Sequence, residues 1–228
     1  MLAALRRAAP PLAALALLVP AGARAEWGGS VVVESDARFR GISLTDERPA
    51  ARVTLGYDHA GGGYAGASLG NVVFEGRGEY AALLGYAGIS GAAGAGWRWD
   101  AGATYWHVAG LSRYDYGEAY AGVLGERWSA RLFLSPDYYG GGAHTAYVEL
   151  DAGWPFAAGW RVAAHVGMLR RVDAGGAGVR SDGRLGAAVQ VGAVELQLAW
   201  VGVSPGGPYV ASYNQRRSTL VASAAFAF

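Results

Sequence analysis

The sequence predicts an all-β fold, a transmembrane antiparallel up-and-down β-barrel of about twelve strands. Three observations predict it: segments of alternating apolar and polar residues, turn residues between them, and connections that alternate between short and long. Because side chains alternate across a strand, one phase of each segment is apolar and the other carries the charges. The apolar phase suits lipid, and the charged phase suits a polar barrel interior.

The segment Ser30–Ser43 shows this alternation at the start of the chain. One face carries Glu34, Asp36, Arg38 and Arg40, and the other carries Val31, Val33, Ala37 and Phe39. The last segment, Thr219–Phe228, keeps Leu220, Ala222, Ala224, Phe226 and Phe228 in one phase. We expect the first and last strands to pair, because closure of a barrel removes both sheet edges.

Six segments follow in the first half of the chain. Charges mark the polar phase of five: Arg52 and Asp58 in Ala51–His59, Glu79 in Glu79–Tyr86, Arg98 and Asp100 in Trp97–Tyr105, Glu118 in Tyr116–Leu124, and Arg127 and Arg131 in Arg127–Ser135. Tyr64–Gly70 is weakly patterned, because four of its seven residues are Gly or Ala.

The second half repeats the pattern in four segments before the last strand. The polar phase carries Glu149 and Asp151 in Thr145–Trp154, Arg161 and His165 in Trp160–Leu169, Arg184 in Asp182–Val191, and Glu195 in Val194–Gly202. Each segment is long enough to cross a bilayer as a tilted strand.

The connections alternate in length. The short ones are Ala60–Gly63, Gly125–Glu126, Pro155–Gly159 and Gly192–Ala193, with Gly88–Gly96 somewhat longer. The long ones are Leu44–Pro49, Asn71–Gly78, Val108–Asp115, Pro136–His144, Arg170–Ser181 and Val203–Ser218. Short periplasmic turns and long outer loops are typical of outer-membrane barrels. A soluble β-sandwich also alternates strands and turns, but does not usually keep apolar residues and strand-end aromatics on one phase throughout.

The N-terminus has the features of a secretory signal peptide. Arg6 and Arg7 precede an apolar run, and Ala23 and Ala25 form a small-residue cleavage site. The alternative, a membrane anchor, needs a longer apolar run. We expect residues 1–25 to be removed and residues 26–228 to form one barrel domain in the outer membrane of a Gram-negative bacterium.

Composition supports a chain of short strands and turns. It contains 37 Gly, 13 Tyr, 8 Trp and no Cys, so we expect no disulfides. All 19 basic residues are Arg, and without Arg6, Arg7 and Arg24 they number 19 − 3 = 16 against 18 acids. This nearly neutral balance argues against a nucleic-acid partner.

The inward phase predicts a candidate pore lining of mixed charge. It consists of Glu34, Asp36, Arg38, Arg40, Arg52, Asp58, Glu79, Arg98, Asp100, Glu118, Arg131, Glu149, Asp151, Arg161, Arg184 and Glu195. Mixed signs predict weak ion selectivity, since sharp discrimination needs rings of one sign. The same charges are also typical of a salt-bridge network that fills a closed barrel. We favour a narrow pore for small solutes, because inward Gly and Ala leave room for water.

Catalytic and metal chemistry have weaker support. His59, His107, His144 and His165 lie on separate segments without paired ligand spacing, so we expect no metal site and no cofactor. Gly91–Gly96 and Gly175–Gly178 precede no helix and are interpreted as turns. A lipid hydrolase would need a serine beside His165 and either Glu149 or Asp151, and no inward serine is obvious there.

Several motifs resemble the TorF family of porins. They are Ser35–Thr45 (SDARFRGISLT), Pro49–Ala50, Gly56–Asp58, Gly63–Gly66, Glu118–Gly122, Leu134–Gly140, Tyr147–Glu149 and His165–Gly167. Of these, the first segment is the specific one. The resemblance implies an outer-membrane channel of unassigned solute and no established catalytic residues.

The expected partners follow from a barrel in the outer membrane. They are membrane lipid and lipopolysaccharide, the barrel-assembly machinery through the C-terminal strand, and small solutes. Tyr138, Tyr139, Tyr209, Tyr213, Arg216 and Arg217 lie in the predicted outer loops. We interpret the loop tyrosines as a headgroup girdle, with adhesion to a partner as the alternative.

Overall fold

The computed structural model describes residues 25–74, 78–94, 96–173, 178–207 and 216–228. The predicted signal peptide, up to residue 24, lies outside these residues, as do Tyr209 and Tyr213 of the last predicted outer loop.

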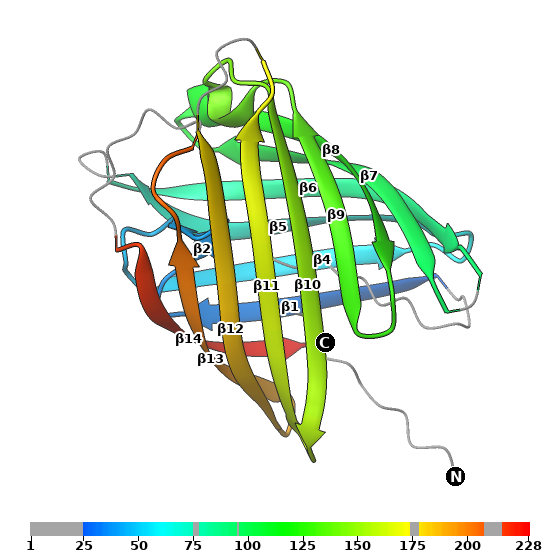
Figure 1. Cartoon of the computed structure of the whole chain (residues 1–228). Coiled ribbons are helices and arrows are strands. Elements are labelled where there is room, and N and C mark those ends of the chain that lie inside the picture. Colours follow the sequence, from blue (N-terminus) through cyan, green and yellow to red (C-terminus); the bar gives the residue numbers. More distant parts are fainter. Residues whose placement is uncertain (1–24, 75–77, 95, 174–177, 208–215) are drawn as a thin grey trace.

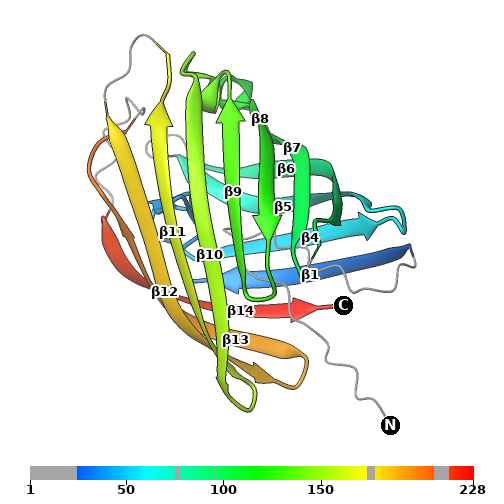
Figure 2. The ribbon, with the colours of Figure 1, turned by 45° about the vertical axis from the view of Figure 1, so that its right-hand side comes forward.

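Within the described residues, twelve antiparallel strands form one closed barrel (Figures 1 and 2). They are β1 (Glu26–Glu34), β4 (Ala50–Asp58), β5 (Gly63–Phe74), β6 (Gly78–Ala92), β7 (Arg98–Val108), β8 (Tyr116–Leu124), β9 (Trp128–Ser135), β10 (Thr145–Ala157), β11 (Trp160–Arg171), β12 (Val179–Val191), β13 (Val194–Val203) and β14 (Ser218–Ala227). A separate hairpin consists of β2 (Arg38–Phe39) and β3 (Ile42–Ser43). The short 3-10 helices η1 (Ser112–Tyr114) and η2 (Tyr138–Gly140) follow β7 and β9.

The first and last strands close the barrel, as the sequence predicts. β1 pairs antiparallel with β14, and Val31 lies opposite Phe226. The backbone of Gly29 and that of Phe228 exchange two hydrogen bonds of 2.9 and 3.0 Å. Every barrel strand therefore has a neighbour on both sides, so the sheet presents no open edge to lipid.

Some strands are longer than their side-chain pattern indicates. β5 runs to Phe74 and β6 runs from Gly78 to Ala92, so most of the predicted loop Asn71–Gly78 is strand. β10 also continues through Pro155, where the sequence predicts a turn, and its register with β11 shifts between Pro155 and Ala157. Such an irregularity at a strand end accommodates proline. Ladder hydrogen bonds do not depend on side chains, so Gly- and Ala-rich strand ends leave little trace in the sequence.

The outer surface of the barrel is apolar. Large exposed side chains on the outward phase include Val33, Leu55, Leu69, Leu134, Leu150, Val166, Leu185, Leu198 and Leu220. A closed sheet with apolar residues outside and charged residues inside is the arrangement of a transmembrane barrel. No helix in the described part of the chain is long and apolar enough to cross a membrane.

Aromatic residues form a belt around the end of the barrel where the turns lie. Its members are Trp27, Tyr57, Trp97, Trp99, Trp128, Trp154, Phe156, Trp160, Phe226 and Phe228. Several contact one another: the ring centres of Trp97 and Trp128 lie 4.9 Å apart, and those of Trp27 and Tyr57 lie 5.1 Å apart. Such a belt is typical of the boundary between the apolar and headgroup regions of a bilayer.

The outer surface yields a stability prediction at Leu198, in the middle of β13. Leu198 is 54% exposed and points outward. We expect Leu198→Arg to reduce the free energy of unfolding from lipid vesicles by about 2–4 kcal/mol, because the charge would lie against hydrocarbon. Urea titration measures this, with Leu198→Ala as the control that loses the side chain without adding a charge. Equal stability of the two variants would contradict a lipid-facing position.

The barrel interior is partly apolar on the side of β5 to β8. The inward phase of β6 carries Ala82, Leu84 and Tyr86, all buried, whereas Leu83 is exposed. The sequence-based assignment of phases on β6 was therefore wrong, and the predicted pore residue Glu79 lies on the outward phase. The misassignment arose because both phases of β6 are apolar and Glu79 is its single charge. Near the long loops, the apolar interior includes Val72, Leu84, Trp106, Tyr116, Tyr138 and Tyr147.

Candidate functional site

A hairpin lies inside the barrel, in the connection between β1 and β4. The sequence predicts one continuous strand over Ser30–Ser43, but β1 ends at Glu34. The chain then turns into the interior and forms β2–β3, with Arg40 (φ 49°) and Gly41 (φ 76°) between the two strands. Two central residues with positive φ define a tight hairpin turn. The alternation of side chains with a period of two continues through such a hairpin. The sequence pattern therefore did not reveal that the chain reverses direction at Arg40 and Gly41.

The base of the hairpin is held by Asp36. Its carboxylate accepts hydrogen bonds from Arg38 Nε at 2.6 Å and from Ser43 Oγ at 2.5 Å. Thr45 Oγ1 accepts from the Ala37 backbone N–H and donates to the Arg48 carbonyl. These side chains are buried within the barrel, so their hydrogen bonds give the base of the hairpin a defined structure.

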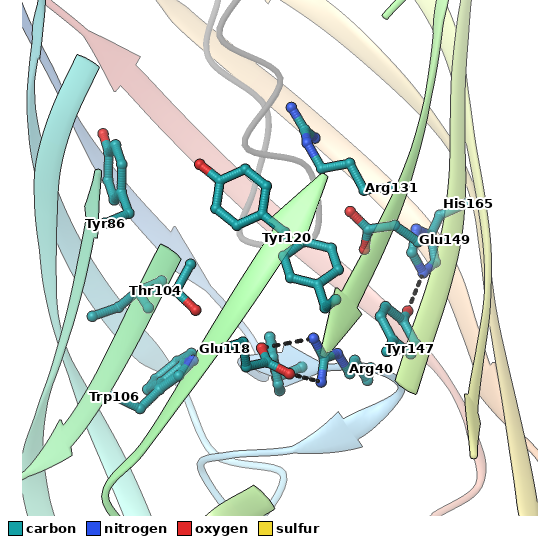
Figure 3. A pocket seen from close by; sticks show the side chains of 13 residues that line it. Arg40, Tyr86, Thr104, Trp106, Glu118, Tyr120, Arg131, Tyr147, Glu149 and His165 are labelled. Carbon is teal, nitrogen blue, oxygen red and sulfur yellow. Dashed lines mark hydrogen bonds and ion pairs between the residues drawn. The ribbon is translucent and has the colours of Figure 1, made fainter. Parts of the chain in front are cut away.

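Arg40, at the tip of the hairpin, reaches the opposite wall. Its guanidinium donates two parallel hydrogen bonds of 2.8 Å to the carboxylate of Glu118 on β8 (Figure 3). The guanidinium carbon lies 4.0 Å from the ring centre of Tyr147 and 4.7 Å from that of Phe39, within the range of cation–π contact. A bidentate pair among aromatic faces fixes both the position and the orientation of the tip.

Gly41 brings the tip against β12 and β13. A Cβ atom at Gly41 would lie 2.7 Å from Val203 Cβ and 2.9 Å from Asp182 Cβ. Arg38 Nη1 adds a 3.0 Å hydrogen bond to the carbonyl of Arg216, just before β14. The hairpin therefore touches the barrel wall on several sides.

This close approach yields a prediction for Gly41→Ala. Positive φ alone costs an L-residue about 1–2 kcal/mol, and the new methyl group also collides with Val203 and Asp182. We expect the hairpin to shift, with a lower free energy of unfolding in urea and larger single-channel currents.

Gly142→Ala is the matched control, because Gly142 also has positive φ, +68°, and a Cβ atom added there would meet no heavy atom of the described residues within 4 Å. It shares the backbone cost without the collision. Equal effects of the two substitutions would show that contact with the wall does not position the hairpin.

Further ion pairs brace the wall of the barrel. Arg52 Nη1 lies 3.2 Å from Glu34 Oε1, and the Arg131 guanidinium lies 3.0 Å from Asp100 Oδ2. Near the turns, Arg161 forms a bidentate pair with Glu195 at 2.9 and 2.6 Å. Charges of both signs therefore neutralise one another over short distances inside the barrel.

A cavity of about 70 Å³ lies beside the hairpin tip. Its lining includes Phe39 and Arg40 from the hairpin and Trp106, Glu118, Tyr120, Arg131, Phe133, Tyr147, Glu149 and His165 from the wall (Figure 3). A space of this size holds a few water molecules. The hairpin and the wall together leave only this small space beside the hairpin tip.

His165 occupies a carboxylate-rich site on the wall next to this cavity. Its Nδ1 atom lies 2.8 Å from Asp151 Oδ1, and its Nε2 atom lies 2.9 Å from Asp182 Oδ1. The Tyr147 hydroxyl lies 3.1 Å from Nε2 and 3.2 Å from both Asp182 oxygens. Glu149 completes the group from β10. The strand register brings these residues together, since Asp151 lies opposite His165 on β11.

The structure places the predicted pore residues in three groups. Those on the inward phase of the wall are Glu34, Arg52, Asp58, Arg98, Asp100, Glu118, Arg131, Glu149, Asp151, Arg161, Arg184 and Glu195. Asp36, Arg38 and Arg40 lie on the internal loop, and Glu79 points outward. Several partners of these charges were missed by sequence reasoning, above all Asp182 and Tyr147. Asp182 is the first residue of the predicted strand Asp182–Val191 and lies on the same phase as Arg184, so its inward position could have been predicted.

The predicted outer-loop residues Tyr138 and Tyr139 belong to the interior cluster. Tyr138 is only 2% exposed, and its ring centre lies 5.1 Å from that of Tyr116. Tyr139 stacks on the same Tyr116 ring at 4.7 Å. Their interpretation as a headgroup girdle was therefore wrong, because both rings pack at the loop end of the barrel interior.

The chain matches the model of one known protein family over most of its length. The model of the Gcw_chp family, described as a bacterial protein of unknown function, matches residues 21–228. The chain belongs to the Gcw_chp family. The resemblance to the TorF family also implied a bacterial family without an assigned function, which agrees with this match. The name TorF itself stays a prediction. Comparison of this Gcw_chp protein with curated proteins gives no match.

Solved structures share the fold of this Gcw_chp protein. The KdgM porin aligns with a TM-score of 0.56 at 9% identity, covering 88% of this chain and 99% of the porin. The KdgM porin in complex with disordered oligogalacturonate gives 0.53 at 8% identity, with 89% and 99% covered. An outer membrane channel from Pseudomonas putida F1 gives 0.48 at 12% identity, with 100% and 99% covered. The two KdgM alignments support a common barrel fold.

Proposed function

We propose that this protein is a channel for the passive diffusion of small solutes across the outer membrane of a Gram-negative bacterium. The observation that carries the proposal is the hairpin inside the barrel, beside a cavity lined by polar and aromatic side chains. A loop that narrows a barrel from within sets the size of the passage without changing the wall. The porin fold of the structural neighbours supports the same function.

The charges around the cavity favour small solutes without a strong net charge. Arg40 and Glu118 form one neutral pair beside the cavity, and Arg131 with Asp100 forms another. Neutral pairs produce a weak field at a distance, whereas selectivity for one ion sign needs a ring of like charges. We therefore propose weakly selective diffusion of neutral, zwitterionic or singly charged solutes.

The alternative function is that of a closed barrel serving anchoring or adhesion. The observation that favours it is the dense bracing of the interior, in which Arg40, Arg52 and Arg131 are all buried and paired. Adhesion would then depend on the long outer connections.

A lipid hydrolase has less support. His165 uses both ring nitrogens on Asp151 and Asp182, and no serine is among its hydrogen-bond partners in the part of the chain that the structure describes. A nucleophile–base pair is the first requirement of acyl transfer.

Single-channel recording of refolded residues 26–228 in a planar bilayer tests the channel. We expect small, steady openings with weak ion selectivity, from protein whose folding is shown by heat-modifiable migration in gels. Heat-denatured protein is the control. Folded protein that gives no current at any applied voltage would overturn the proposal and favour the closed barrel.

We also propose membrane partners from the outer surface. The aromatic belt and apolar wall would lie in lipid, with lipopolysaccharide around the loop end, and β14 with the terminal Phe228 would be recognised by the barrel-assembly machinery.

A further inference from the structure

The carboxylate-rich site around His165 has the composition of a metal centre. Glu149 and Asp151 are two residues apart on β10 and therefore point to the same side, into the barrel. His165 on β11 lies directly opposite Asp151. One ligand atom from each of the three residues lies within 4.8 Å of the others. Small shifts of these side chains would bring all three to the bond lengths of about 2.0–2.2 Å that zinc makes with nitrogen and oxygen.

The imidazole of His165 is oriented as a metal ligand requires. Ligating histidines almost always donate their second ring N–H to a carboxylate or carbonyl. Asp182 Oδ1, 2.9 Å from Nε2, is placed to accept that hydrogen bond. A bound metal ion would take the place of the proton that Nδ1 shares with Asp151 Oδ1, 2.8 Å away, so that the Nδ1 lone pair would bind the ion. The Tyr147 hydroxyl in turn hydrogen-bonds the Asp182 carboxylate and holds it in place.

Glu149 supplies an independent argument that this site can take a cation. Its side chain is buried, with 7% of the residue exposed, and it makes no hydrogen bond or ion pair with any residue that the structure describes. It nevertheless lines the cavity beside His165 (Figure 3). A buried carboxylate without a hydrogen-bonding partner is costly, so the site favours a cation that the carboxylate can bind.

The two nearby arginine side chains form ion pairs with other carboxylates. The Arg40 guanidinium is held by Glu118, and Arg131 contacts Asp100. Glu149, Asp151 and Asp182 thus surround one imidazole with three carboxylates. A divalent ion would restore the balance of charge.

We propose that Glu149, Asp151 and His165 bind a divalent transition-metal ion of the zinc type, with Asp182 and Tyr147 as positioning residues. One imidazole nitrogen and two carboxylate oxygens form a mixed ligand set that zinc accepts. The histidine spacing predicted no metal site, because the second and third ligands are carboxylates that only the strand register brings to His165. The cavity gives an ion a place from which to enter, whether or not solutes pass through the barrel.

Cobalt(II) substitution tests the proposal with a readout independent of transport. Refolded residues 26–228, without a polyhistidine tag and stripped with a chelator, are titrated with Co²⁺ and followed by visible absorption. We expect one equivalent to bind with absorption bands of low-coordinate Co²⁺, and Zn²⁺ to displace it. We expect Asp182→Asn to weaken binding about 10–100-fold, as is usual when the partner of a ligating histidine is lost.

Glu149→Gln is the decisive variant, because it breaks no hydrogen bond among the described residues and is expected to fold. We expect it to lose most of the Co²⁺ affinity and the increase in Tm that Zn²⁺ gives the wild type. His144→Ala, which removes an exposed histidine, is the control and should bind as the wild type does.

Two results would overturn the metal site. One is folded wild-type protein without Co²⁺ absorption at millimolar metal, which would leave His165 as a protonated bridge between Asp151 and Asp182. The other is equal affinity in the wild type and Glu149→Gln, which would place bound metal elsewhere on the chain.

Discussion

A variant without the internal hairpin is expected to conduct severalfold more current than the wild type. Glu34 and Ala50 are paired neighbours on β1 and β4, so an Asn-Gly turn can join them directly in place of Ser35–Pro49. Every barrel strand is retained, but the hairpin, its ion pairs and its side of the cavity are lost. The increase follows because the remaining passage is bounded by the wall alone. Single-channel recording measures it.

The control shortens a different long connection in the same way. Arg170 on β11 pairs with Val179 on β12, so residues 171–178 can also be replaced by Asn-Gly. This change leaves the hairpin and its partners in place, and we expect wild-type conductance. If both variants conduct as the wild type does, the narrowest point of the passage lies elsewhere.

Removing the partner of the hairpin tip has the second large effect. Glu118→Ala leaves the Arg40 guanidinium buried without its carboxylate, a change that typically costs about 3–5 kcal/mol. We expect the tip to leave its site while the barrel stays folded, because the hairpin is covalently joined to the wall only at its two ends and, among the described residues, no barrel strand pairs with it. Channel openings should then be frequent and large, and the free energy of unfolding in urea should decrease.

A double-mutant cycle isolates this pair. Arg40→Ala combined with Glu118→Ala should recover part of the stability lost in Glu118→Ala, because no unpaired charge remains buried. Glu195→Ala is the matched control, since it breaks the bidentate pair with Arg161 near the turns, away from the hairpin. Similar gating changes in Glu195→Ala and Glu118→Ala would mean that general loosening of the barrel, not release of the tip, opens the channel.

The sequence predicted the strand number, the closure between first and last strands and the inward phase of most charges. These depend on alternation, which an apolar exterior imposes on every strand. The two faces of β6 were assigned the wrong way round because Leu83 and Leu84 are both apolar. The pattern therefore could not distinguish the face toward lipid from the face toward the apolar part of the barrel interior. Where the two environments of a strand are alike, alternation carries no information.

The candidate site was less predictable for a different reason. Arg38 and Arg40 were identified as interior charges, but the turn at Arg40 and Gly41 reverses the chain without interrupting the alternation. The group of Glu149, Asp151, His165 and Asp182 depends on the register of three strands. Register is set by pairing across the sheet, which a single sequence does not display.

The contacts of the hairpin also impose an order on biogenesis. The hairpin follows the first strand, yet its tip lies against Glu118, Asp182 and Val203, and Arg38 bonds to the carbonyl of Arg216. Glu118 is synthesised about halfway along the chain, but Asp182, Val203 and Arg216 follow only near its end. The hairpin can therefore make all of its contacts only when nearly the whole barrel has formed, although it is one of the earliest segments to leave the ribosome.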